Sequence, residues 1–219
     1  MSYEYILFDL DGTLTDPSLG ITNSIAYALK KNNIEPPERE KLYKYIGPPL
    51  IDSFMEDYGF SRDGAVKALW DYREYYEEAG IFENSVYDGI DDLLKSLYES
   101  GKKIYLATSK PEIYARQILE HFNLAKYFTF IAGNTMAEDR HHKVDVINYL
   151  YGECPEIEKE KAIMVGDRNY DVNGAHGAGI ECIGVLFGFG DETEMKEASA
   201  DFIAPTVFDL KNILLGESL

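Results

Sequence analysis

Short apolar runs alternate with amphipathic segments over most of the chain, and this alternation predicts its fold. The runs have the length and composition of buried strands and cover residues 3–8, 102–108, 127–133, 161–167, 180–186 and 201–204. Helical periodicity lies between them from residue 85 onward. In residues 88–101, for example, Asp88 is expected to cap a helix that stops at Gly101. The sequence therefore predicts an α/β fold, with a doubly wound parallel sheet covered by helices on both faces.

The segment between residues 17 and 84 breaks this alternation. Its stretches are compatible with helix, and none reads as a convincing strand. An all-helical block that begins soon after the first strand suggests a helical cap inserted into the α/β domain. We therefore expect a core formed by residues 1–16 and 85–219, and a cap formed by residues 17–84.

The net charge and the composition of the chain limit the kinds of molecule that it is expected to bind. The chain has 39 aspartates and glutamates against 21 lysines and arginines, which gives a net charge of −18. Neither nucleic acid nor an anionic membrane is expected as a partner, because both require a basic surface. No run approaches the roughly 18 apolar residues that span a bilayer. The first residues carry Glu4 and Asp9 instead of the basic start of a signal peptide. We expect a cytoplasmic protein, either a monomer or a homodimer.

Polar clusters follow the predicted strands at the edge where ligands bind in such sheets. They are "DLDGT" at 9–13, "TSK" at 108–110, "RHHK" at 140–143 and "GDRNYD" at 166–171. Any one of them alone is typical of a solvated loop or a helix cap. Asp9 and Asp11, however, stand two residues apart where a buried strand ends, and like charges repel at short range. Together the clusters indicate a site that holds a cation or performs chemistry.

The order and content of these clusters resemble the haloacid dehalogenase superfamily, specifically its phosphatases with a helical cap. Motif I matches residues 9–13, motif II Thr108, motif III Lys143, and motif IV Gly166 and Asp167 together with Asp171. The stretches "DGTLTDP", "IGPPL", "VYDGI", "ATSKP" and "MVGDRNYDV" look like the phosphoglycolate phosphatase-like branch, some members of which are regarded as 5′-nucleotidases. The resemblance covers essentially the whole chain.

The resemblance implies a role for each motif residue. Asp9 is expected to be the nucleophile that forms an aspartyl-phosphate, and Asp11 the general acid and base. Lys143 is expected to place a positive charge on Asp9 and on the phosphoryl group.

The substrate's phosphoryl oxygens have their own expected partners. Gly12 lets the chain turn and brings backbone N–H groups to an oxyanion. Thr108 is expected to bind through its hydroxyl, and Ser109 through its N–H group at the start of a helix. Lys110, beside them, is expected to cap that helix or to lie at the rim of the site.

Magnesium is the cofactor that the resemblance implies. Mg²⁺ prefers oxygen ligands, and its expected ligands are the carboxylates of Asp9 and Asp167 and the backbone carbonyl of Asp11. Asp171 is not expected to bind the ion directly, but to orient the site through the ligands or through water. In the cap, Gly47 within "IGPPL" either faces the active site and contacts the substrate or forms an ordinary turn between helices.

These residues predict a Mg²⁺-dependent phosphatase that hydrolyses a small phosphate monoester, similar to phosphoglycolate phosphatase. A 5′-nucleotidase acting on nucleoside monophosphates and a sugar-phosphate mutase are the catalytic alternatives. A non-catalytic phosphate-binding protein is a further one, although all of the motif residues are present.

Overall fold

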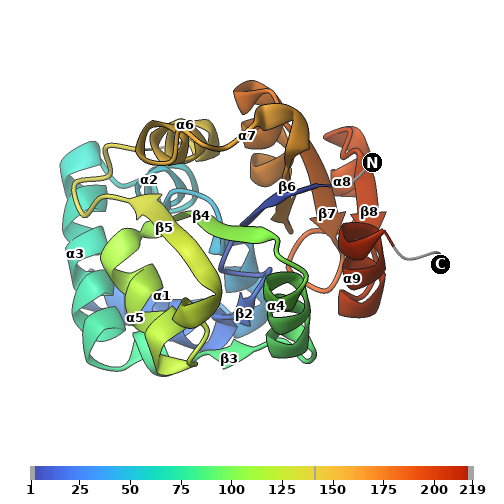
Figure 1. Ribbon diagram of the computed structural model, residues 1–219. Helices are drawn as coiled ribbons and strands as arrows, with labels where there is room; N and C mark the ends of the chain where they lie inside the picture. The colour runs from blue at the N-terminus through green and yellow to red at the C-terminus, as the bar shows by residue number, and fades with distance from the viewer. Residues whose placement is uncertain (1–2, 141, 217–219) are drawn as a thin grey trace. The chain divides into compact units, whose positions relative to one another are not determined.

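The computed structural model describes residues 3–140 and 142–216. The chain folds into two compact units (Figure 1). The core unit combines the chain up to Thr15 with the chain from Val86 onward, and the cap unit holds Asp16–Ser85. Two short strands, β2 (Thr15–Asp16) and β3 (Ser85–Val86), pair where the chain passes from one unit to the other and back.

The core unit contains a six-stranded sheet in the order β5-β4-β1-β6-β7-β8. Every neighbouring pair is parallel. The strands are β1 (Tyr5–Phe8), β4 (Lys103–Pro111), β5 (Phe128–Asn134), β6 (Ala162–Gly166), β7 (Glu181–Val185) and β8 (Phe202–Ala204). Each overlaps one of the apolar runs, so the predicted α/β fold with a parallel sheet is confirmed. Because β1 runs between β4 and β6, the residues that follow these three strands meet at one edge.

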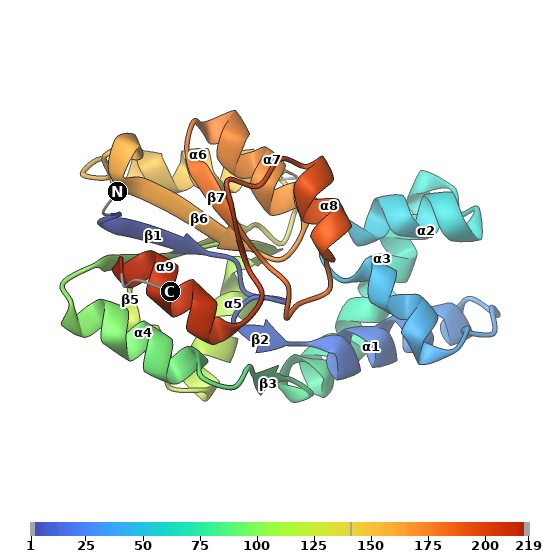
Figure 2. The same ribbon diagram turned by 90° about the vertical axis from the view of Figure 1, so that its right-hand side faces the viewer.

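Helices cover both faces of this sheet (Figure 2). One face carries α6 (Lys143–Glu153), α7 (Asn169–Ala178) and α8 (Glu192–Glu197), and the other carries α4 (Ile90–Glu99), α5 (Glu112–His121) and α9 (Val207–Leu215). Two short 3₁₀ helices, η3 (Ala125–Tyr127) and η4 (Lys159–Lys161), precede β5 and β6. Buried apolar side chains of the central strands, including Leu7, Tyr105 and Met164, pack with Val146 and Ile147 of α6. This core holds the first residues of α6 and α7 beside the sheet edge.

All of the regular secondary structure between the first and last residues of the cap unit is helical. It comprises α1 (Ser18–Lys31), η1 (Arg39–Tyr45), α2 (Leu50–Tyr58), α3 (Arg62–Glu78) and η2 (Gly80–Phe82). Its interior is apolar and aromatic, with Ile25, Leu29, Phe54 and Tyr76 buried. Within the described residues of the whole chain, no helix is both long and apolar enough to cross a membrane.

Two local predictions were wrong. Asp88 does not cap α4, because Gly89 adopts a left-handed φ of 87° and the helix begins at Ile90. The strand expected to end at residue 108 continues to Pro111, and α5 begins only at Glu112. Between Ala107 and Pro111 the pairing of β4 with β5 shifts register, so "TSK" belongs to an irregular strand end and not to a helix start.

Candidate active site

The first two acidic side chains stand on the turn that follows the central strand. Asp9 comes directly after β1, and its N–H group donates to the carbonyl of Val165 in β6 at 2.9 Å. Gly12 then turns the chain with a φ of 85°, a conformation that favours glycine. Its N–H group donates to the carbonyl of Thr15 at 2.8 Å. This hydrogen-bonded turn fixes Asp9 and Asp11 at the sheet edge.

Lys143, the first residue of α6, forms ion pairs with two of the acidic side chains of the site. Its Nζ lies 2.8 Å from Oδ1 of Asp9 and 2.8 Å from Oδ1 of Asp171, and it donates to the carbonyl of Ala107 at 3.0 Å. Burial by itself lowers the pKa of Lys143, but the carboxylates of Asp171 and Asp9 outweigh burial and raise that pKa well above its ordinary value. The side chain is therefore a cation held at the centre of the site.

Asp167 follows β6 and is fully buried. Its Oδ2 accepts a hydrogen bond from the N–H group of Phe189 at 2.8 Å, and its Oδ1 accepts one from the hydroxyl of Thr13 at 3.4 Å. Burial, followed by the charge of Asp171, raises the pKa of Asp167 well above its usual range. Without a nearby cation the ionised form of this group is costly.

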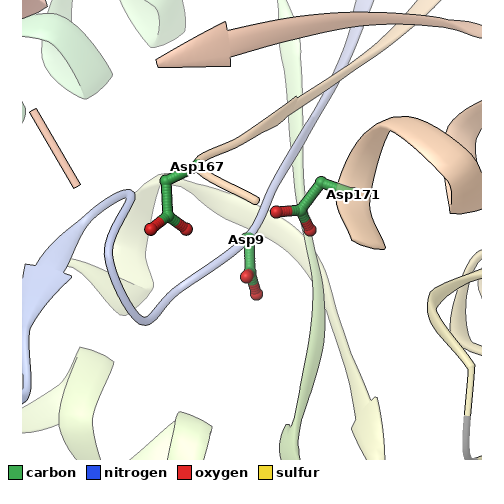
Figure 3. Close-up of side chains that lie close together, drawn as sticks. All are labelled: Asp9, Asp167 and Asp171. Carbon is green, nitrogen blue, oxygen red and sulfur yellow. The ribbon is translucent and has the colours of Figure 1, made fainter. Parts of the chain in front are cut away.

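Asp171 stands in the first turn of α7, where its Oδ2 accepts from the N–H group of Arg168 at 3.1 Å. Burial raises the pKa of Asp171 above its usual range, although Lys143 lowers it. Asp9, Asp167 and Asp171 each offer a carboxylate oxygen, and these oxygens lie within 4.8 Å of one another. Figure 3 shows the three carboxyl groups gathered beside the end of β1. The cluster has the donor chemistry that a hard divalent cation prefers.

Charge balance gives an independent test of that fit. Four carboxylates and two ammonium groups meet here: Asp9, Asp11, Asp167 and Asp171 with Lys110 and Lys143. Two negative charges of this set are uncompensated when all six groups are ionised. A single Mg²⁺ ion would balance them and would favour the ionised form of Asp167, whose pKa is raised by burial and then by the charge of Asp171. The residues therefore fit a divalent metal.

The end of β4 supplies the groups beside Asp11. Thr108 is buried, and its Oγ1 accepts from the N–H group of Lys110 at 3.3 Å. Ser109 lies within the strand, three residues before α5, so its expected place at a helix start was wrong. Lys110 is neither a helix cap nor a rim residue: it is 9% exposed, and its Nζ lies 2.7 Å from Oδ2 of Asp11.

The loop after β7 also approaches the site, although, like Lys110, it belongs to none of the motifs. Besides the hydrogen bond from Phe189 to Asp167, the backbone of Gly188 runs close to the site. A Cβ atom on Gly188 would lie 2.2 Å from the carbonyl oxygen of Gly12 and 2.5 Å from Cβ of Asp167. The stretch "FGFG" at 187–190 carries no ionisable side chain. Its glycines are the only sequence signal, because they permit such close backbone approach.

Gly47 belongs to the cap unit and lies apart from these residues in the chain. It has a φ of 105° and precedes α2, whose N-terminal flanking residue is Pro49. A turn between helices is thus present, with glycine at its positive φ, and contact with substrate stays a prediction.

Known proteins are similar to this chain in sequence and in fold. Residues 6–185 match the family model of haloacid dehalogenase-like hydrolases. A 5′-nucleotidase of Pseudomonas aeruginosa is 41% identical over 214 residues, covering 98% of this chain and 96% of that protein. The tyrosine-protein kinase PtkA of Mycobacterium tuberculosis is 35% identical over 97% of this chain and 73% of its own length. The crystal structure of a protein described as a predicted phosphatase, from Clostridium acetobutylicum, superimposes with a TM-score of 0.95. It is 46% identical, and the match covers 99% of this chain and 100% of that one.

Proposed function

Because this chain belongs to the haloacid dehalogenase-like hydrolases, we propose that it is a phosphatase that hydrolyses a small phosphate monoester with the help of Mg²⁺. One observation carries the proposal: the buried carboxylate of Asp9 is paired with Lys143 at 2.8 Å, with Asp11 two residues further along the same turn. A nucleophile, a cation and a candidate proton carrier thus share one site. The phosphatase description of the Clostridium acetobutylicum structure supports the same reaction class.

Asp9 begins the reaction. A carboxylate oxygen attacks phosphorus, the bond between phosphorus and the ester oxygen breaks, and an aspartyl-phosphate forms. Lys143 places its charge beside the attacking carboxylate and stabilises the negative charge that develops on the phosphoryl oxygens. The hydroxyl of Thr108 and the N–H group of Ser109 are proposed to bind those oxygens.

Asp11 carries the protons. In the first step its carboxyl group gives a proton to the leaving ester oxygen. In the second step its carboxylate takes a proton from water as the water oxygen attacks phosphorus, the bond to Asp9 breaks and inorganic phosphate leaves. Such acid–base assistance contributes typically about 10²–10⁴-fold to a rate.

Asp9 and Asp167 are the proposed side-chain ligands of Mg²⁺, with the backbone carbonyl of Asp11 as the third protein ligand. The ion supplies electrostatic stabilisation of the phosphoryl group when bound. Asp171 is proposed to act from behind the ligands, because its Oδ1 holds Lys143. The site suits a divalent cation because its four carboxylates outnumber its two ammonium groups.

The substrate belongs to the class of small phosphate monoesters. The 41% identical 5′-nucleotidase supports a nucleoside 5′-monophosphate, and the motif stretches resemble enzymes that act on phosphoglycolate. The cap unit, with the turn at Gly47, is proposed to select between such esters.

A panel assay tests the proposal. Phosphate release is measured from nucleoside 5′-monophosphates, phosphoglycolate, sugar phosphates and p-nitrophenyl phosphate, with Mg²⁺ and with a chelator, for the wild type and Asp9→Asn. We expect Mg²⁺-dependent release that is absent in the variant. Isomerised sugar phosphate without free phosphate would indicate a mutase. Binding without turnover across the panel would indicate a non-catalytic protein.

A further inference from the structure

We propose that Lys110 is a positioning residue for Asp11: its ammonium group holds one carboxylate oxygen and leaves the other for proton transfer. This inference rests on the proposed function, because it takes Asp11 as the group that moves the protons.

The two oxygens of Asp11 have different surroundings. Oδ2 lies 2.7 Å from Nζ of Lys110, and the two side chains are only 14% and 6% exposed. Oδ1 is buried and has no hydrogen-bond partner among residues 3–140 and 142–216. A buried oxygen without a partner costs free energy, so its persistence in the site is consistent with a function. A carboxyl group that gives and takes a proton needs one oxygen that is not already engaged.

The strand end directs Lys110 toward Asp11. Ala107 pairs with Ala132 and Pro111 pairs with Asn134, so three residues of β4 stand opposite Gly133 of β5. Such bulges bend a strand and re-aim its side chains, often beside active sites. A Cβ atom on Gly133 would lie 2.7 Å from the carbonyl oxygen of Lys110. Glycine at 133 therefore permits the close approach on which the bulge depends.

Lys110 also touches the proposed phosphate-binding group. Its N–H group donates to Oγ1 of Thr108 at 3.3 Å, which leaves the hydroxyl hydrogen of Thr108 free to point elsewhere. One residue thus orients the proton carrier through its side chain and a phosphate-binding hydroxyl through its backbone. Only the side-chain contact is lost when Lys110 is replaced.

Two other roles have different signatures. A lysine that binds substrate directly would raise KM when removed and leave kcat largely unchanged. A purely structural ion pair would affect stability and leave both constants unchanged. A positioning role predicts a loss in kcat that is confined to the steps in which Asp11 transfers a proton.

The experiment compares Lys110→Met and Lys110→Arg with the wild type on two substrates. An alkyl phosphate needs a proton on its leaving oxygen, whereas p-nitrophenyl phosphate releases a phenolate that leaves without one. We expect Lys110→Met to lower kcat on the alkyl ester by about 10²-fold, the size expected when a reacting group is misplaced by about 1 Å. With p-nitrophenyl phosphate we expect a rapid release of one phenolate per active site and then slow turnover, because water attack still needs Asp11.

Two further variants, Lys110→Arg and a double substitution with Asp11→Asn, test whether Lys110 acts through its charge and through Asp11. Lys110→Arg retains a cation and should recover part of kcat. Lys110→Met in an Asp11→Asn background should cause little further loss, because the residue through which Lys110 acts is already removed. Lys103→Met is the matched control: Lys103 is exposed at the opposite end of β4, so kcat should not change.

The outcomes separate this inference from the proposed function. If the wild type releases no phosphate from either ester, the proposed function fails first. If the wild type is active and folded Lys110→Met retains its kcat, or shows only a raised KM, the positioning role is wrong. A full additional loss in the Asp11→Asn background would contradict it as well. A thermal melt of each variant identifies any that has failed to fold.

Discussion

The Nζ atom of Lys143 lies 2.8 Å from Oδ1 of Asp9, and the two side chains are 2% and 12% exposed. The same nitrogen lies 2.8 Å from Oδ1 of Asp171, so a single cation joins the turn after β1, which carries the proposed nucleophile, to the first turn of α7. Inside a protein such a pair is expensive to break, because one partner is then left buried and uncompensated.

Replacing Lys143 should therefore impair both rate and stability. We expect Lys143→Met to lower kcat by about 10²–10³-fold, the typical cost of losing one electrostatic stabiliser of the transition state, and to lower the thermal midpoint. Steady-state kinetics and a thermal melt measure the two effects. Lys95→Met, an exposed position on α4, is the control. Unchanged kcat in Lys143→Met would remove Lys143 from the mechanism.

Asp167→Asn should change the metal response and leave the fold intact. The buried Asp167 carboxyl has a pKa raised by burial and by Asp171, so removing its charge should not destabilise the metal-free protein. Added Mg²⁺ should raise the thermal midpoint of the wild type by mass action and have little effect on the variant. An equal rise in both proteins would show that the metal is held elsewhere.

The lack of room for a side chain at Gly188 leads to a steric prediction. Because a Cβ atom there would overlap Gly12 and Asp167, Gly188→Ala should displace the proposed metal ligand and weaken the apparent affinity for Mg²⁺. Titration of activity with Mg²⁺ measures this shift. Gly152 on α6 has no atom within 4 Å of such a Cβ, so Gly152→Ala should keep its metal affinity and gain up to about 1 kcal/mol of helix stability. Equal affinity in both variants would contradict the steric argument.

The cap unit contains a charge cluster that should respond to pH. Asp71 of α3 accepts from Lys67 at 2.9 Å and from Asn32 at 2.9 Å, and lies 3.0 Å from Nζ of Lys31. Burial raises the pKa of Asp71, but these three partners outweigh burial and hold the pKa below its ordinary value. A folded-state pKa below the unfolded value of about 3.9 means that the cluster stabilises the fold above about pH 4. That contribution is lost as pH falls through the folded-state pKa.

Asp71→Asn should accordingly lower the thermal midpoint at pH 7, and its deficit relative to the wild type should shrink below about pH 4. Melts across this pH range measure the difference. Glu56→Gln, at an exposed position of α2, is the control and should follow the wild type. A deficit that stays constant with pH would mean that the cluster's charges do not contribute.

The sheet could be predicted from the sequence because its strands are apolar runs, the central ones largely buried, and helical periodicity separates them. The gathering of Asp9, Asp11 and Asp167 at one edge followed from parallel topology alone. Their roles, and that of Gly47, stay predictions.

The position of Lys110 could not be predicted in the same way. The bulge that aims it toward Asp11 depends on the register between β4 and Gly133, and pairing partners are not visible in a local pattern. Ser109 was expected at the start of a helix, whereas the chain continues as strand up to Pro111. The loop around Gly188 was missed for another reason: it acts through backbone, and no charged side chain marks it.

The central claim is that Asp9 carries the phosphoryl group. Asp11→Asn enzyme, whose second step should be slow, is mixed with p-nitrophenyl phosphate and Mg²⁺, quenched and reduced with borohydride, which converts an aspartyl-phosphate to homoserine. Peptide mass spectrometry then locates the changed residue. We predict homoserine at position 9, at close to one per molecule, and none in Asp9→Asn/Asp11→Asn. Phenolate release with residue 9 unmodified, or with the mark on another aspartate, would contradict the account.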